Sequence, residues 1–187
     1  MLADPVDSSL PWGGGRGPMS RTRLGLLAGA ARAFAEQGLR RSTMQSVAVA
    51  AGVAKATLYN HFRTKDEVAR ALLALELDRL STTAAVLPTA EALAALSDEL
   101  GAHPVLRRLA GTEPEVLAAL LGTDRWNELT GRLAAALRVD DDGAELAARW
   151  LLGVVLQPGR STTRHRHAAR LAAVLGAAPL SPGAASG

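Results

Sequence analysis

The sequence predicts an all-α protein. Of its 187 residues, 38 are Ala and 31 are Leu, two residue types that favour helices. Aromatic residues make up only 3%, and β-branched residues are too sparse for a large sheet. Apolar residues recur at helical spacing between breaks of Gly, Pro and Asp, without a convincing strand pattern or an internal repeat. Because Cys is absent, disulfides and thiolate metal sites are excluded.

The first helix is predicted from about 21 to 37 and ends at Gly38, with an inward stripe of Leu24, Leu27, Ala31 and Phe34. A short second helix begins at a cap, Ser42 or Thr43, and runs to about residue 51, where Gly52 breaks it. Its Val47 and Ala48 face inward. The third helix covers about 55 to 62.

A capping box formed by Thr64 and Glu67 starts the fourth helix, which runs to Leu80 or beyond. Its apolar residues cover more than one face, so it is expected to pack on both sides. Further helices are predicted near 89–100, 104–110, 113–121, 123–137, 142–156 and 162–175. Pro104 and Pro114 suit first turns, and the acidic run 140–142 suits a helix start. The last two helices are placed to form an antiparallel pair.

The positive charge is concentrated near the N-terminus. Between Ser20 and Lys65 there are eight basic residues and one acidic residue, a net charge of +7, whereas the whole chain carries only +3. This asymmetry indicates an end that binds a polyanion, attached to a neutral or acidic body. A solvated Arg-rich surface is an equally open alternative.

The two ends of the chain are predicted to be disordered. Residues 1–19 and 177–187 are rich in Gly, Pro, Ser or Ala and lack periodicity. The N-terminus lacks the features of a signal peptide, and no apolar run reaches the ~18 residues that span a bilayer. We therefore expect a cytoplasmic protein without a membrane partner. Met19 is a candidate alternative start.

The second helix, the turn at Gly52 and the third helix have the dimensions of a helix-turn-helix. A recognition helix packs one face on its own domain and offers the other to the major groove of DNA. Leu58 and Phe62 share the inward face, and Ala56, Tyr59, Asn60 and Arg63 point the opposite way. Short helix pairs joined by Gly are common in all-α proteins, so this spacing alone is only suggestive.

Residues 26–67 resemble the N-terminal domain of TetR-family transcriptional regulators. The matching elements, in order and without a gap, are ARAFAEQG at 31–38, STM at 42–44, VA at 47–48, AGV at 51–53, TLY at 57–59, HF at 61–62 and KDE at 65–67. The resemblance implies a DNA-binding domain at 20–66 and a helical effector-binding and dimerisation domain at 67–176. The second part resembles the family only in its helical character and length.

The resemblance also implies which residues contact DNA. They are Arg21, Arg23, Thr43, Gln45, Lys55, Ala56, Thr57, Tyr59, Asn60, His61 and Lys65. Thr43, Tyr59 and Lys65 would contact the phosphate backbone, and Asn60 would approach bases. For His61, a role as a packed residue of the domain is as well supported as a contact with DNA. Two positions depart from the family pattern: Ala54 cannot cap the recognition helix, and Ala56 replaces a common Gly.

The resemblance implies a homodimer that binds a pseudo-palindromic operator and a small-molecule effector. The apolar character of the body favours a lipophilic effector, with candidate contacts at His103, Leu106, Leu117, Leu121, Trp126, Leu129 and Leu133. The candidate dimer interface comprises Trp150, Leu151, Val154, Val155, Leu171 and Val174. For both sets, an ordinary core within one chain is the competing interpretation.

The sequence thus predicts a ligand-responsive TetR-like regulator, most simply a repressor. The alternative is a non-specific architectural protein that binds DNA through the same basic face. An enzyme is disfavoured, because the chain has no P-loop, GxSxG or HExxH motif. No cofactor or metal is expected: His165 and His167 are two residues apart and so diverge on a helix, and arginines surround them.

Overall fold

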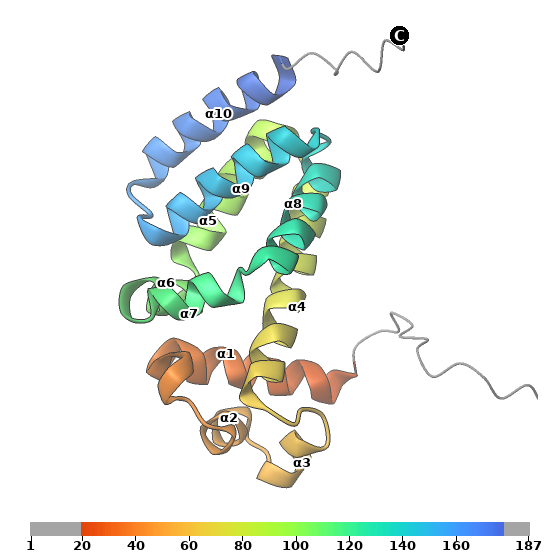
Figure 1. The fold of residues 1–187 in the computed structure, drawn as a ribbon, viewed down its shortest axis with the longest axis vertical. Helices are drawn as coiled ribbons and strands as arrows, with labels where there is room; N and C mark the ends of the chain where they lie inside the picture. The colour runs from red at the N-terminus through yellow and green to blue at the C-terminus, as the bar shows by residue number, and fades with distance from the viewer. Residues whose placement is uncertain (1–19, 178–187) are drawn as a thin grey trace, which may run out of the picture.

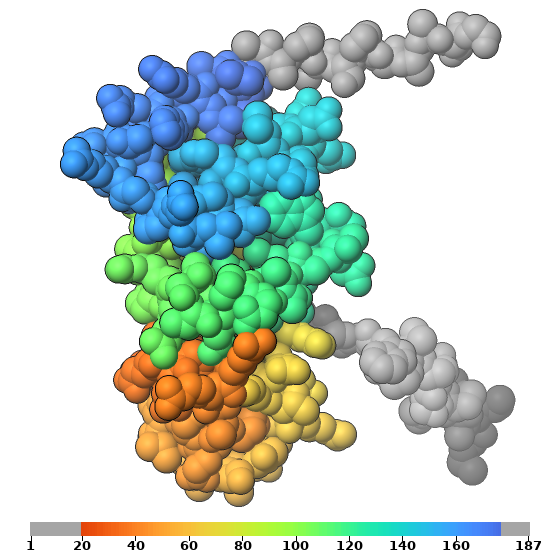
Figure 2. Space-filling model, turned by 60° about the vertical axis from the view of Figure 1, so that its left-hand side comes forward, coloured from red at the N-terminus to blue at the C-terminus, as the bar shows by residue number. Residues whose placement is uncertain are grey.

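The structure is a computed structural model that describes residues 20–177. The tail predicted at 1–19, the candidate start Met19, and nearly all of the tail predicted at 177–187 lie outside the described residues. Over 20–177 the chain forms ten α-helices and no strand, as the sequence predicts. The first three helices lie at one end of the molecule and the last helix at the other, with α4 running between them (Figures 1 and 2).

The helices follow the predicted order. Their bounds are α1 Arg21–Arg41, α2 Met44–Ala51, α3 Lys55–Tyr59, α4 Lys65–Ala85, α5 Thr89–Ala102, α6 Pro104–Thr112, α7 Pro114–Leu120, α8 Thr123–Leu137, α9 Asp141–Leu156 and α10 Ser161–Ala177. Pro104 and Pro114 occupy the first turns of α6 and α7, as predicted. Asp140 caps α9 by accepting from the N–H of Gly143 at 2.8 Å.

The buried face of α1 differs from the predicted stripe. Leu27 and Phe34 are buried, but Leu24 is 41% exposed, so its assignment to the core is wrong. The helix packs against α2, α4 and α6, which demands a broader buried face than one stripe. The residues that provide it are Leu26, Leu27, Ala30, Ala33 and Phe34.

The segment between α1 and α2 is shaped by Gly38. Its φ of 79° and ψ of 171° interrupt the helix there, after which a last turn continues to Arg41. The buried hydroxyl of Ser42 donates to the carbonyl of Gly38 at 2.6 Å and so stabilises this turn. Thr43, and not Ser42, caps α2, because its hydroxyl accepts from the N–H of Ser46 at 3.1 Å.

The predicted caps of the next two helices are mostly confirmed. Ala54 makes no side-chain cap for α3, and Thr64 caps α4 through the N–H of Glu67 at 3.1 Å. In a capping box the carboxylate of Glu67 would accept from the N–H of Thr64. It accepts instead from the N–H of Arg63, one residue earlier. The third helix ends at Tyr59 and not at Phe62, although the N–H of Phe62 still bonds to the carbonyl of Leu58 at 3.0 Å.

Two hydrophobic cores stabilise the chain. The first joins α1, α2 and α3 to the start of α4 and to buried residues of α6, α7 and α9, such as Leu109, Leu117 and Val155. The second joins the end of α4 to α5, α8, α9 and α10. The helix-turn-helix therefore shares its core with the C-terminal helices, and α4 contributes to both cores along its length.

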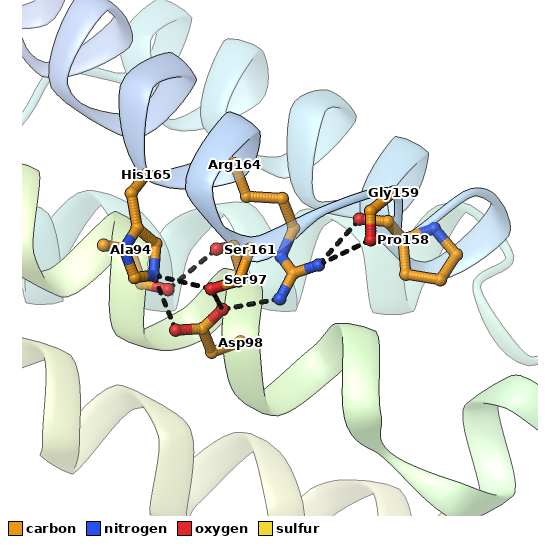
Figure 3. A network of polar contacts seen from close by, with 8 residues as sticks. All are labelled: Ala94, Ser97, Asp98, Pro158, Gly159, Ser161, Arg164 and His165. Carbon is orange, nitrogen blue, oxygen red and sulfur yellow. Dashed lines mark hydrogen bonds and ion pairs between the residues drawn. The ribbon is translucent and has the colours of Figure 1, made fainter.

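The last helix packs mainly on α5, and the predicted pairing of α10 with α9 is wrong. Asp98 of α5 provides the specific contacts (Figure 3). Its carboxylate accepts from Arg164 at 2.5 Å, from His165 at 2.6 Å and from Ser161 at 2.9 Å. Arg164 also donates to the carbonyls of Pro158 and Gly159, so the turn before α10 is held by the same side chain.

Among the described residues, no helix combines the length and the apolar character needed to cross a membrane. The same residues contain no group of three metal-ligating side chains, and His165 binds a carboxylate.

Candidate nucleic-acid interface and internal cavity

The helix-turn-helix forms one end of the molecule, with α2 and α3 farthest from the C-terminal helices (Figure 1). Gly52 ends α2 in the left-handed conformation, with φ of 69°, and its N–H bonds to the carbonyl of Val49 at 3.0 Å. Leu58 and Phe62 are buried and attach α3 to α1 and α4, as predicted. The opposite face of α3 is therefore left to solvent.

Most of the predicted DNA-contacting side chains lie on this exposed end. Thr43 and Gln45 are exposed at the start of α2, and Lys55, Ala56, Tyr59 and Asn60 are exposed on α3 and its C-cap. Thr57 and His61 are half-buried. Tyr59 is a 45% exposed aromatic residue, and the ammonium of Lys55 lies 5.6 Å from its ring centroid, within reach of a cation–π contact.

Of the three other predicted contacts, two have structural partners within the chain. The guanidinium of Arg23 stacks 4.3 Å from the ring centroid of Phe62. The ammonium of Lys65 donates to the carbonyls of Ser42 at 2.9 Å and Arg40 at 3.2 Å, so it stabilises the α1–α2 connection. Arg21 is exposed in the first turn of α1, and Ser20 is the N-cap. Arg21 and Arg23 thus both lie in the first turn of α1.

A large apolar cavity lies between the two ends of the molecule. It holds about 1260 Å³ of space free of protein atoms, its open mouth included. All seven residues predicted as effector contacts line it: His103, Leu106, Leu117, Leu121, Trp126, Leu129 and Leu133. The sequence did not identify the contribution of α1 through Phe34 and Leu39, nor that of the leucines of α4.

A buried carboxylate joins the cavity wall to the helix-turn-helix. Glu113, between α6 and α7, is only 5% exposed and accepts from the N–H groups of Leu39 and Arg40, both at 3.0 Å. A side chain at Gly38 would collide with it, since a Cβ there would lie 2.1 Å from Oε1 of Glu113. Sequence reasoning missed this contact because the partners are more than 70 residues apart.

The predicted dimer residues fall into two groups. Leu151, Val154 and Val155 of α9 are buried within the chain, which matches the competing interpretation of an intramolecular core. Trp150 and Leu171 are half-buried, and Val174 of α10 is 60% exposed. The exposed apolar side chains of this end also include Leu146 and Leu156 of α9.

The fold and the basic end of the chain define a helix-turn-helix protein of the DNA-binding class. Residues 26–72 match the family model of bacterial regulatory proteins of the tetR family. The HTH-type transcriptional repressor KstR2 of Mycobacterium tuberculosis is 42% identical over 64 residues. That match covers 34% of this chain and 32% of the repressor, so the chain spans about a third of the length of this relative.

Solved structures share the fold over nearly the whole chain. The fatty acid degradation regulator FadR from Bacillus halodurans has a TM-score of 0.63 at 15% identity, covering 88% of this chain and 99% of FadR. The TetR-family repressor AlkX from Dietzia, implicated in biodegradation of n-alkanes, has a TM-score of 0.59 at 22% identity, covering 86% and 97%. At these identities the likeness establishes the fold alone.

Residues 26–72 thus match the helix-turn-helix domain of TetR-family DNA-binding transcriptional regulators, and the helices that follow share the fold of solved TetR-family structures. The resemblance seen in the sequence is thereby confirmed. The family comprises regulatory proteins and not enzymes, in agreement with the expectation from the sequence.

Proposed function

We propose that this protein is a repressor that binds a pseudo-palindromic operator as a homodimer and leaves it when a small lipophilic molecule enters the cavity. One observation carries this proposal: a single apolar cavity is walled by the effector-side helices and also by Phe34 and Leu39, which belong to the core of the helix-turn-helix. A ligand in the cavity therefore touches the domain whose position it has to change.

The proposed DNA contacts are the exposed residues at the start of α2 and on α3. The hydroxyl of Thr43 and the first N–H groups of α2 suit a phosphate. Lys55 and Asn60 suit base edges, and Tyr59 suits the backbone beside them. We assign Lys65 and Arg23 a mainly positioning role, because their charged groups already contact carbonyls and an aromatic ring.

The proposed switch is a shift between a DNA-competent and an incompetent arrangement of the dimer. Helix α4 begins directly after the helix-turn-helix, and its Leu72, Leu73, Leu77 and Leu80 line the cavity. A ligand that binds one position of α4 better than the other shifts the population toward that position. Moving α4 changes the separation of the two recognition helices, which must match about one turn of DNA.

The dimer interface is proposed at the end of the molecule formed by α9 and α10 (Figure 2). Trp150, Leu171 and Val174 remain candidates from the predicted set, and the buried Leu151, Val154 and Val155 would support the interface from beneath. FadR is a regulator of fatty acid degradation and AlkX is implicated in biodegradation of n-alkanes, which accords with a lipophilic effector for this chain.

The test of this function is a salt-dependent footprint on the DNA upstream of the protein's own gene. A repressor of this kind protects one pseudo-palindromic site and binds it at least about 10³-fold more tightly than scrambled DNA. Equal affinity for both DNAs would instead support the alternative, a non-specific architectural protein that uses the same basic face. In either case, affinity falls as salt rises, because phosphate contacts release counterions.

A further inference from the structure

The walls of the cavity are apolar over most of their area. Leucines make up most of the lining residues, and α4, α5, α6, α7, α8 and α9 all contribute them. Among the lining residues, the side chains with hydrogen-bonding groups are Glu76, Ser81, His103, Trp126 and Arg132. The indole N–H of Trp126 is already used, since it donates to Glu145 at 2.6 Å.

Both charged residues of the lining form ion pairs with partners within the chain. Glu76 accepts from Arg79 at 3.0 Å, and Arg79 also pairs with Glu99 at 2.5 Å. Arg132 pairs with Asp78 and, at 2.9 Å, with Glu128. Each cluster contains two carboxylates and one guanidinium, so no cation is left over for an anionic ligand. A cationic ligand would have to compete with an arginine for its carboxylate.

His103 and Ser81 are the two lining residues with a hydrogen-bond donor that no partner among the described residues takes up, and of the two only His103 has a ring held in place by a helix cap. It caps α6, where its Nδ1 accepts from the N–H of Leu106 at 3.4 Å. Burial lowers the pKa of His103, and the opposing effect of the Glu76 carboxylate is smaller, so the ring is neutral near pH 7. With Nδ1 as the acceptor, the proton lies on Nε2, which has no partner among the described residues.

We infer that the effector is an uncharged, largely apolar molecule with one hydrogen-bond acceptor, such as an ester or ketone oxygen, which the Nε2–H of His103 binds. This inference rests on the proposed function, because it names the ligand class of the same cavity. The apolar walls bind the body of the ligand, the surplus carboxylate of each cluster disfavours an anion, and a cation would have to displace an arginine from its ion pairs. His103 then orients the ligand by its polar group.

The test uses three probes that share a ten-carbon chain and differ in charge: methyl decanoate, decanoate and decyltrimethylammonium. Each probe competes with the uncharged fluorophore N-phenyl-1-naphthylamine for the full-length protein at about pH 8, where decanoate is ionised. We expect the ester to displace the fluorophore at a concentration at least about tenfold lower than either ion, because an ion would enter an apolar site without a free partner.

Two variants test the role of His103. His103→Asn keeps a side-chain oxygen that can cap α6 but lacks the reach of the imidazole N–H. We expect it to weaken ester binding about fivefold, the loss of one hydrogen bond, while fluorophore binding stays unchanged. The same substitution at the exposed His167 of α10 is the matched control and leaves both affinities unchanged.

The outcomes distinguish an error in the inferred ligand class from an error in the proposed effector site. If the fluorophore binds but an ion competes as well as the ester, or His103→Asn binds the ester normally, the inference is overturned and the cavity remains an effector site. If neither the fluorophore nor any probe binds the full-length protein, the proposed effector site itself is wrong, and the inference falls with it.

Discussion

At the scale of single residues, the exposed face of α3 carries the side chains that we propose to contact DNA. Tyr59 is one of only six aromatic residues in the chain, and nearly half of its surface faces solvent. An aromatic ring in that position contributes less to the core than a buried one, which favours a contact with DNA. Thr57, half-buried beside it, adds a hydroxyl on the same helix.

The double variant Tyr59→Phe with Thr57→Ala is expected to lose specific operator binding by at least about tenfold while it keeps its fold, because it removes two hydroxyls and no core atom. A gel-shift titration measures the affinity, and circular dichroism checks the fold. Thr82→Ala removes an exposed helical hydroxyl far from α3 and serves as the control. Unchanged operator affinity in the double variant would count against our contact assignment.

Glu113 shows how much one buried carboxylate stabilises. Glu113→Ala leaves the N–H groups of Leu39 and Arg40 without their acceptor, and Leu39 is buried. We expect a loss of about 2–4 kcal/mol in the free energy of unfolding, measured by urea titration. Glu115→Ala, which removes only the half-exposed ion pair with Arg40, should cost less than about 1 kcal/mol. Equal costs for the two variants would contradict the contact.

At the scale of elements, one polar cluster supports the docking of α10 on α5 (Figure 3), in addition to the apolar contacts of the second hydrophobic core. Burial raises the pKa of Asp98, but the hydrogen bonds from His165, Arg164 and Ser161 together outweigh it and hold the pKa below the ordinary value of 3.8. A carboxyl group with a lowered pKa stabilises the folded state above its unfolded pKa. That contribution is lost as the pH falls through the lower, folded value.

The variant Asp98→Asn should therefore be less stable than the wild type above about pH 4, and the difference should shrink as the pH falls below that value. Because the Asp98 side chain is 42% exposed, we expect a difference of about 1 kcal/mol or less. Urea titrations of both proteins between about pH 3 and 7 measure it. A stability difference that does not change with pH would exclude this role for the carboxylate.

At the scale of the whole molecule, the proposed dimer links two DNA-binding ends through α9 and α10. Val174→Glu places a carboxylate on this proposed interface. Because Val174 is 60% exposed in one chain, we expect the variant to keep its fold. We expect monomers in sedimentation experiments, with the dimer dissociation constant raised at least about 100-fold. Operator binding should weaken in parallel, because two half-sites need two linked recognition helices.

Val86→Glu is the matched control for this prediction. Val86 is 79% exposed at the end of α4, away from the proposed interface. The control should sediment as the wild type does. A dimeric Val174→Glu protein, or equal dissociation of both variants, would show that the interface lies elsewhere.

The helix-turn-helix could be predicted from the sequence because its determinants are local. The caps at Thr43 and Thr64, the turn at Gly52 and the buried pair Leu58 and Phe62 all act within a few residues of themselves. The exposed position of Leu24 was not predictable, because it depends on which helices cover α1. The pairing of α10 with α5 likewise depends on Asp98, 66 residues before Arg164.

By itself, the sequence determined the helical class, the order of the helices, the basic DNA-binding end and the residues on its exposed face, since helix periodicity, capping and charge are properties of neighbouring residues. Only the tertiary structure decided the rest. It placed α10 against α5, attached Glu113 to the backbone before α2, and brought Phe34 into the wall of the same cavity as Trp126. Those contacts join residues far apart in the chain, and their partners are fixed only when the helices pack.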